Sequence, residues 1–189
     1  MRVVLVGPPG SGKGTQGPPL ASHLGVPYLS TGEILRTEAE ERTALGRRVA
    51  DVLRSGGLVP DDLVLDVVAA ALDGTGDGYV LDGFPRTVTQ AEVTERPGGP
   101  VAPPDVVVHL AVPTSVVHER LARRAAEDDR PDDRDPTVAD RRVRVYEDET
   151  APLIDRYGDQ GRLVTVDADR PVEEVTAAII AAVDAHRAP

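Results

Sequence analysis

Residues 7 to 15 read Gly-Pro-Pro-Gly-Ser-Gly-Lys-Gly-Thr and directly follow an apolar run, Arg2–Val6. Glycines let the backbone curl so that N–H groups point inward at an anion, and a following helix presents its positive N-terminal end to that anion. Lys13 adds a mobile charge for terminal phosphates, and the hydroxyl of Thr15 suits Mg²⁺. The order predicts a phosphate-binding loop, and the preceding strand disfavours the alternative, a glycine-rich hairpin turn.

Lys13 is also the only lysine among the 21 lysine and arginine residues of the chain. A compact ammonium and a planar guanidinium are not interchangeable. Lysine at this one position therefore supports the phosphate-loop interpretation.

A second motif, Asp82-Gly83-Phe84-Pro85-Arg86, closes the apolar run Tyr79–Asp82. The Asp82 carboxylate could hold a Mg²⁺-bound water opposite the first loop. Arg86 leaves a turn stiffened by proline, and one helical turn later the amide of Gln90 can donate to and accept from adenine. Three polar groups beside one strand end favour a binding site over a helix-capping aspartate with a surface arginine.

Composition argues against several classes of function. The formal net charge of −11 disfavours non-specific binding to nucleic acid or to anionic membranes. No cysteine is present for a disulfide, thiol chemistry or a cysteine-based zinc site, and no ligand spacing joins the four histidines, His23, His109, His118 and His186. No apolar run could span a membrane and the N-terminal strand leaves no signal peptide, so we expect a cytoplasmic protein.

The elements that must position these motifs alternate between strands and helices. Continuous apolar runs with strand character recur at Arg2–Val6, Val26–Ser30, Tyr79–Asp82, Val106–Ala111 and Leu163–Val166. This pattern predicts an α/β fold with a five-stranded parallel sheet and helices on both faces, in one domain over residues 1–189. Ligands bind such sheets at the carboxyl ends of the strands, where both motifs fall.

Two segments are predicted to project from this sheet. Residues 33–73 read as three helices, with Thr31 as an N-cap, and the part over residues 30–59 is large enough to move as a helical subdomain. Residues 127–136 are charged residues and prolines, which by composition is typical of a solvated loop. The functional alternative is a short lid over residues 125–136 that carries arginines over a polyphosphate.

Pro18 and Pro19 fall inside the helix expected over residues 16–24. An interior proline removes a hydrogen bond and costs on the order of 3 kcal/mol. We therefore expect a kink or a helix restart at Pro18.

The chain resembles adenylate kinases, and more broadly the nucleoside monophosphate kinases, in four segments. These are Gly7–Gln16 (GPPGSGKGTQ), Ser30–Arg36 (STGEILR), Asp82–Thr87 (DGFPRT) with Gln90, and Tyr146–Ile154 (YEDETAPLI). They occur in the family's order over nearly the whole chain, and a short lid without metal ligands is similar to the short-lid form. The resemblance implies a P-loop nucleotide-binding fold with a nucleoside-monophosphate-binding insertion and without zinc.

The resemblance also implies a role for individual residues. ATP would be held by Gly10, Ser11, Gly12, Lys13, Gly14, Thr15, Arg120, Arg124 and Arg170. AMP would be held by Thr31, Arg36, Gly57, Leu58, Val59, Gly83, Phe84, Pro85, Arg86, Gln90, Arg130 and Arg142. The catalytic charges would be those of Lys13, Arg86, Arg124, Arg130 and Arg142. Mg²⁺ would be held through water by Thr15 and Asp82. The lid is one residue longer than the family pattern, so either Arg130 or Arg134 is the functional lid arginine.

Together these implications form one hypothesis, the reversible transfer of a phosphoryl group from Mg·ATP to AMP to give two ADP. Such transfer needs positioning and charge stabilisation and no protein nucleophile. We expect a monomer whose partners are ATP and AMP.

Another nucleoside monophosphate is an alternative substrate, although Thr31 and Gln90 favour adenine, and similar pyrimidine-nucleotide kinases carry asparagine where this chain has Thr87. A regulator without turnover is the other alternative, suggested by Pro18 and Pro19.

Overall fold

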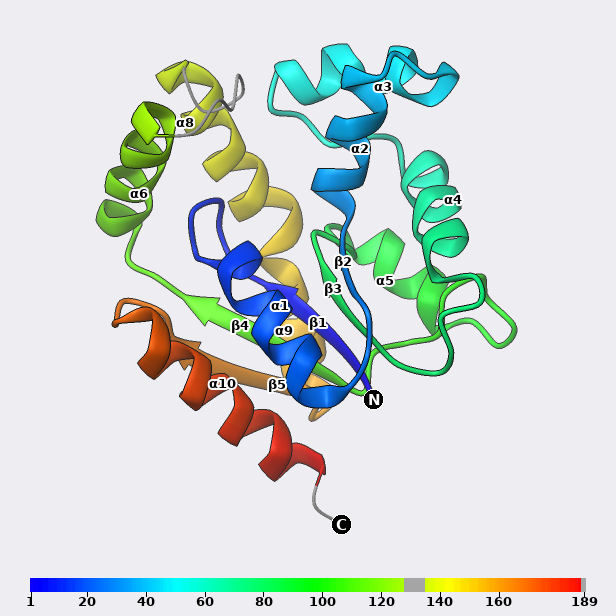
Figure 1. Ribbon diagram of the computed structural model, residues 1–189, viewed down its shortest axis with the longest axis vertical. Coiled ribbons are helices and arrows are strands. Elements are labelled where there is room, and N and C mark those ends of the chain that lie inside the picture. The colour runs from blue at the N-terminus through cyan, green and yellow to red at the C-terminus, as the bar shows by residue number, and fades with distance from the viewer. Residues whose placement is uncertain (128–134, 188–189) are drawn as a thin grey trace.

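The computed structural model describes residues 1–127 and 135–187. Five parallel strands form one sheet in the order β2-β3-β1-β4-β5 (Figure 1). The strands are β1 Arg2–Val6, β2 Tyr28–Ser30, β3 Tyr79–Asp82, β4 Val106–Ala111 and β5 Leu163–Asp167. The predicted parallel α/β fold is confirmed. β2 begins two residues later than predicted, because the Val26 N–H bonds to the Ala21 carbonyl at the end of the preceding helix.

Helices cover both faces of the sheet, because successive strand residues point to opposite sides. Val3 and Leu5 pack in one buried cluster with α1 (Lys13–Leu24) and α10 (Val172–Arg187). Val4 and Val6 pack in the other cluster. That second cluster includes side chains of α4 (Asp61–Leu72), α5 (Val88–Glu95) and α9 (Pro152–Asp159).

The three helices predicted between β2 and β3 are present. They are α2 (Thr31–Glu40), α3 (Ala44–Arg54) and α4, and in Figure 1 α2 and α3 stand beyond the carboxyl end of the sheet. The predicted N-cap is wrong. Ser30, the last residue of β2, accepts the Glu33 N–H at 3.4 Å, because α2 follows β2 without a loop. Thr31 instead donates its hydroxyl to the Asp82 carbonyl at 3.2 Å.

A second pair of helices rises beside the other half of the sheet. Side chains of α6 (Thr114–Glu127) and α8 (Pro136–Val145) pack together (Figure 1). α8 continues into one π-helical turn, η1 (Tyr146–Thr150), and α9 begins at Pro152. The central part of the predicted lid, residues 128–134 with Arg130 and Arg134, lies outside the described residues.

α1 runs unbroken from Lys13 to Leu24, so the predicted kink or restart at Pro18 is wrong. A proline cannot donate to the carbonyl four residues earlier. For Pro18 and Pro19 those carbonyls belong to Gly14 and Thr15, which are exposed, so water can replace the lost hydrogen bonds. The cost of the prolines is therefore low enough for the buried side of α1 to hold the helix on the sheet.

Gly17 allows the ring of Tyr28 to lie directly on α1. A Cβ at Gly17 would lie 2.0 Å from Cε2 of Tyr28, so we expect Gly17→Ala to lower the free energy of unfolding by about 1–3 kcal/mol. Urea denaturation measures the change. In a Tyr28→Ala background the same alanine should be neutral or stabilising, because it favours the helix. An equal cost in both backgrounds would contradict the proposed ring contact.

Candidate active site

The carboxyl ends of the strands open into a cleft of about 1240 Å³. It is lined by the loop after β1, the start of α2, the turn before α4, the loop after β3, and residues of α6, α8 and the segment after β5. These elements bring together the predicted site residues Gly10, Ser11, Gly12, Lys13, Gly14, Thr15, Thr31, Arg36, Gly57, Leu58, Val59, Asp82, Gly83, Pro85, Arg86, Gln90, Arg120, Arg124, Arg142 and Arg170. Residues far apart in sequence thus share one cavity.

Among the described residues that were predicted for the site, Phe84 is the one that does not line the cleft. Its side chain is 1% exposed and belongs to the hydrophobic cluster on the α4 side of the sheet. The side chain is an anchor for the turn after β3, so any contact of this residue with a ligand would have to come from its backbone.

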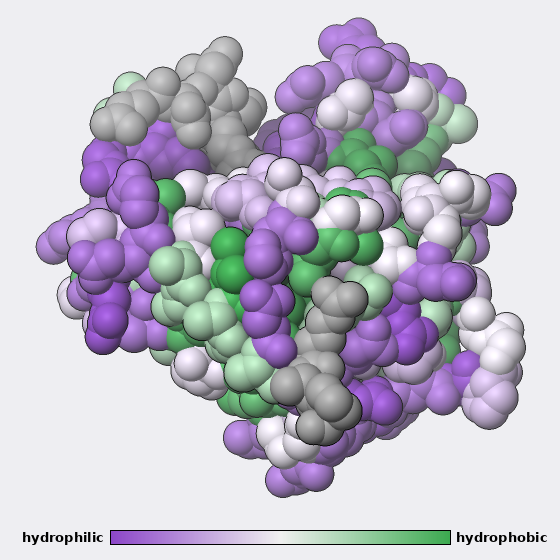
Figure 2. Space-filling view, turned by 60° about the horizontal axis from the view of Figure 1, so that its bottom comes forward, coloured by the Kyte–Doolittle hydropathy of each residue, from purple (hydrophilic) through white to green (hydrophobic). Residues whose placement is uncertain are grey.

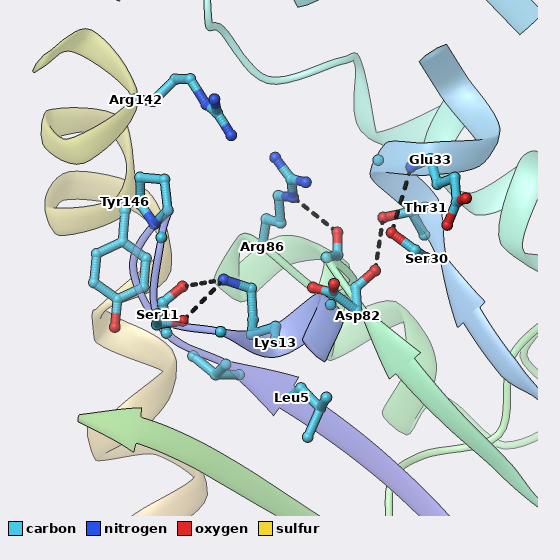
Figure 3. Close-up of a pocket in the computed structure, with 18 of the residues that line it drawn as sticks. Leu5, Ser11, Lys13, Ser30, Thr31, Glu33, Asp82, Arg86, Arg142 and Tyr146 are labelled. Atoms are coloured by element: carbon cyan, nitrogen blue, oxygen red, sulfur yellow. Dashed lines mark hydrogen bonds between the residues drawn. The ribbon is translucent and has the colours of Figure 1, made fainter. Parts of the chain in front are cut away.

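The loop after β1 folds around the ammonium group of Lys13. Gly12, the N-cap of α1, has a left-handed backbone with a φ of 96°, which glycine adopts without strain. The Lys13 Nζ donates to the carbonyls of Gly7 at 2.8 Å and Pro8 at 3.0 Å, and to Ser11 Oγ at 3.3 Å (Figure 3). The ammonium thus lies beside the positive N-terminus of α1, which is the arrangement an anion-binding loop requires.

The environment of Lys13 disfavours its charge. Its pKa is lowered to about 8, mainly by burial; Asp82 acts in the opposite direction, and the nearby Arg86 and Arg142 add to the lowering. Burial also lowers the pKa of Arg86, with Arg142 adding to the effect. Several cations therefore converge on one desolvated region that an anion of high charge would neutralise.

The turn after β3 holds the guanidinium of Arg86 in a fixed position. Its Nε donates to the Gly83 carbonyl at 2.8 Å, and its own carbonyl accepts the Thr150 hydroxyl at 2.8 Å. Gly83 has a φ of 85°, and a Cβ there would lie 2.9 Å from Nη2 of Arg86. Figure 3 shows Arg142 extending from α8 toward Arg86 across the cleft.

Two further arginines lie near the segment after β5. Arg120 donates to the Ala168 carbonyl at 2.8 Å and lies 3.6 Å from the Asp169 carboxylate. Arg170 donates from Nε to Asp167 Oδ2 at 3.0 Å. Their guanidinium groups line the same cleft as Lys13.

Oxygen donors suited to Mg²⁺ occur on two sides of the phosphate loop. The Thr15 hydroxyl and the Asp82 carboxylate both line the cleft, and the Tyr28 hydroxyl donates to Asp82 Oδ2 at 3.1 Å. In the described ranges, no group of three His, Asp or Glu side chains forms a metal cage. The two oxygens therefore fit Mg²⁺ that keeps much of its water, the usual way in which this ion binds beside phosphates.

Sequence reasoning missed three residues that support the site. Tyr28 holds Asp82, Thr150 holds the Arg86 carbonyl, and Asp61 Oδ1 accepts from Gln90 Nε2 at 2.7 Å. Asp61 carried only a helix-start signal after Pro60, and Thr150 lay within the YEDETAPLI segment without a separate signal. Their partners are distant in sequence, so these contacts could not be read from local patterns.

A cleft at the carboxyl edge of a parallel sheet, with a glycine-rich loop at a helix N-terminus and several arginines facing it, defines a P-loop phosphotransferase that acts on nucleotides. The family model for adenylate kinase matches residues 5–162. An adenylate kinase of Cyanothece sp. (strain PCC 7425 / ATCC 29141) is 44% identical over 97% of this chain and 95% of its own length. One of Thermobifida fusca (strain YX) is 45% identical over 93% of this chain and 94% of its own length. The chain therefore belongs to the adenylate kinase family of nucleoside monophosphate kinases.

Proposed function

We propose that this protein transfers the terminal phosphoryl group of Mg·ATP to AMP, reversibly, giving two ADP. The observation that carries the proposal is the convergence of Lys13, Arg86 and Arg142 between the phosphate loop and the turn after β3. These cations come from opposite walls of one cleft, where a donor phosphate and an acceptor phosphate would meet.

The ATP side of the proposed site is the loop after β1. The backbone N–H groups of residues 10–15, with Lys13, would hold the phosphates at the N-terminus of α1. Arg124 would contact the phosphates, while Arg120 and Arg170 would lie beside the adenine near the segment after β5. Mg²⁺, held through water by Thr15 and Asp82, would neutralise phosphate charge.

The AMP side lies between the α2–α3 insertion and the loop after β3. Arg36 and Arg86 would bind the AMP phosphate, and Thr31 lines the same cleft. The backbone of residues 57–59 and the Gln90 amide would contact the base. Residues 83–85 would hold the turn, with Phe84 as its buried anchor.

Catalysis would follow from position and charge. The transferred phosphoryl group spreads negative charge over its oxygens, and Lys13, Arg86, Arg124 and Arg142 would stabilise that charge in a site that excludes water. We propose that the insertion over residues 30–59 closes on AMP and that the segment 125–136, with Arg130 or Arg134, closes on ATP, so that the phosphoryl group does not pass to water.

The direct test is ADP formation from Mg·ATP with AMP, CMP, UMP and GMP offered separately. Turnover with AMP and little with the others is the expected result. Turnover with another nucleotide would keep the phosphate site and reject the base assignment. ATP binding without any turnover would favour the regulator alternative, although the unbroken α1 removes the feature that suggested it.

We further propose a cytoplasmic monomer whose partners are ATP and AMP, with no nucleic acid or membrane among them. The net charge of −11 supports this, and on the face in Figure 2 hydrophilic residues predominate. Among the described residues, Val172 is the only large hydrophobic residue that is exposed. No helix in the described ranges has the length and apolar character to cross a membrane.

The affinity for ATP should be highest below pH 8 and fall as the pH rises above it. The pKa of Lys13 is about 8 in the free protein, so below that pH its charge attracts phosphate, and above it the amine becomes neutral. Calorimetric titrations across this range measure the dissociation constant. Lys13→Ala is the control, with weaker binding and no transition near pH 8. If the affinity of the parent protein for ATP were as insensitive to pH as that of Lys13→Ala, the prediction would be wrong.

A further inference from the structure

The amide of Gln90 is held at both ends by partners from other parts of the chain. Its Nε2 donates to Asp61 Oδ1 at 2.7 Å, and its Oε1 accepts the backbone N–H of Arg86 at 2.7 Å. The side chain is 1% exposed, yet it lines the cleft. The amide therefore meets a ligand only through the part that these two bonds leave available.

The chemistry of the two partners determines which end of the amide is oxygen. A backbone N–H only donates, so it requires Oε1 of Gln90, whereas an ionised carboxylate only accepts, so it requires Nε2. With Arg86 as the only partner, the amide could rotate and meet other groups. Asp61 adds a second, opposite requirement, and the flipped amide would then face two mismatched partners in a buried position.

Asp61 is well placed to hold this orientation without contacting a nucleotide. It is the first residue of α4, is half-buried, and does not line the cleft. The N-terminal end of α4 favours a negative charge there. Gln90 is fixed from its own helix as well, because its backbone N–H donates to the hydroxyl of Thr87, the N-cap of α5, at 3.1 Å.

The orientation matters because an amide has two donors and two acceptor positions. In Gln90 one of each is used, so one N–H and one lone pair remain in a fixed order. Adenine carries an exocyclic amine that donates beside a ring nitrogen that accepts. Hypoxanthine reverses this order, with a carbonyl that accepts beside a ring N–H that donates. An amide in one orientation matches one of these bases, and the flipped amide matches the other.

We propose that Asp61 is a positioning residue that locks the Gln90 amide and thereby determines which purine the monophosphate site accepts. The inference rests on the proposed AMP site. It assigns to Asp61 a role in discrimination between a 6-amino and a 6-oxo purine, exerted through Gln90.

The test compares AMP with IMP as phosphoryl acceptors from Mg·ATP. In Asp61→Ala we expect KM for AMP to rise about tenfold, kcat to change by less than about threefold, and the AMP-to-IMP ratio of kcat/KM to fall at least about tenfold. Asp61→Asn keeps a hydrogen bond to Gln90 but can donate as well as accept, because its amide can turn, so its KM for AMP should stay within about threefold of the parent while its AMP-to-IMP ratio falls as in Asp61→Ala. Asp62→Ala removes the neighbouring carboxylate, which is exposed in the same helical turn, and should leave both quantities unchanged.

If Asp61 acts only through its charge at the start of α4, a different pattern of results is expected. Asp61→Asn would then resemble Asp61→Ala, Asp62→Ala would share the loss of thermal stability, and the AMP-to-IMP ratio would not change. That pattern, in a parent that phosphorylates AMP, overturns this inference and leaves the proposed function intact. A parent that phosphorylates no AMP overturns both. Asp61→Ser, which suits a helix start but is too short to reach Gln90, tests the same ratio if the alanine variant does not fold.

Discussion

Lys13→Ala is expected to lower kcat by about 10³-fold, the upper range for removal of one group that stabilises transition-state charge. Lys13 is the only lysine of the chain, and its ammonium lies in a desolvated region beside the N-terminus of α1. No other side chain of the phosphate loop carries a positive charge. Initial rates at saturating Mg·ATP and AMP measure the loss.

Lys13→Arg separates shape from charge in the same assay. The Nζ of Lys13 fits between the Gly7 and Pro8 carbonyls and the Ser11 hydroxyl, and a planar guanidinium cannot reproduce this geometry. We expect a loss of about 10²-fold or more in kcat. Thermal melting should show that both variants are folded, since burial of the ammonium opposes its charged form. Activity near that of the parent in Lys13→Ala would exclude the charge mechanism.

Gly46→Ala is expected to have the largest effect on stability, a loss of about 3 kcal/mol or more. Gly46 lies in α3, where a Cβ would lie 1.8 Å from the Glu38 carbonyl oxygen and 2.7 Å from the Ala39 nitrogen. These are backbone atoms of α2, which cannot move aside as a flexible side chain can. The two helices would have to separate, so KM for AMP should rise more than KM for ATP. Denaturant unfolding and steady-state kinetics measure the two effects.

Gly158→Ala is the matched control for Gly46→Ala. Gly158 is also helical, in α9, but it is exposed, and the nearest atom to an added Cβ is Leu163 Cδ2 at 3.9 Å. Alanine favours a helix over glycine by about 1 kcal/mol, so this variant should be equal to the parent or more stable. A similar loss in both variants would show that the close contact of α2 and α3 is not the cause.

Local sequence predicted those features whose physical causes are themselves local. The phosphate loop was found because its glycines, lysine and hydroxyl are adjacent and follow a strand. The five strands were found from continuous apolar runs, and the three helices between β2 and β3 from their start and turn signals. The resemblance to a known family added roles for residues, and the Lys13 variants test one of these roles directly.

Contacts between distant segments were decided only by the tertiary structure. α1 is unbroken at Pro18 and Pro19, because Gly14 and Thr15, whose carbonyls lose their donors, are exposed residues while the opposite side of the helix is buried. The Gln90 amide takes one orientation because Asp61, 29 residues earlier, lies against it. A propensity or motif describes neighbours in the chain, whereas these outcomes depend on burial and on partners that only the folded sheet brings together.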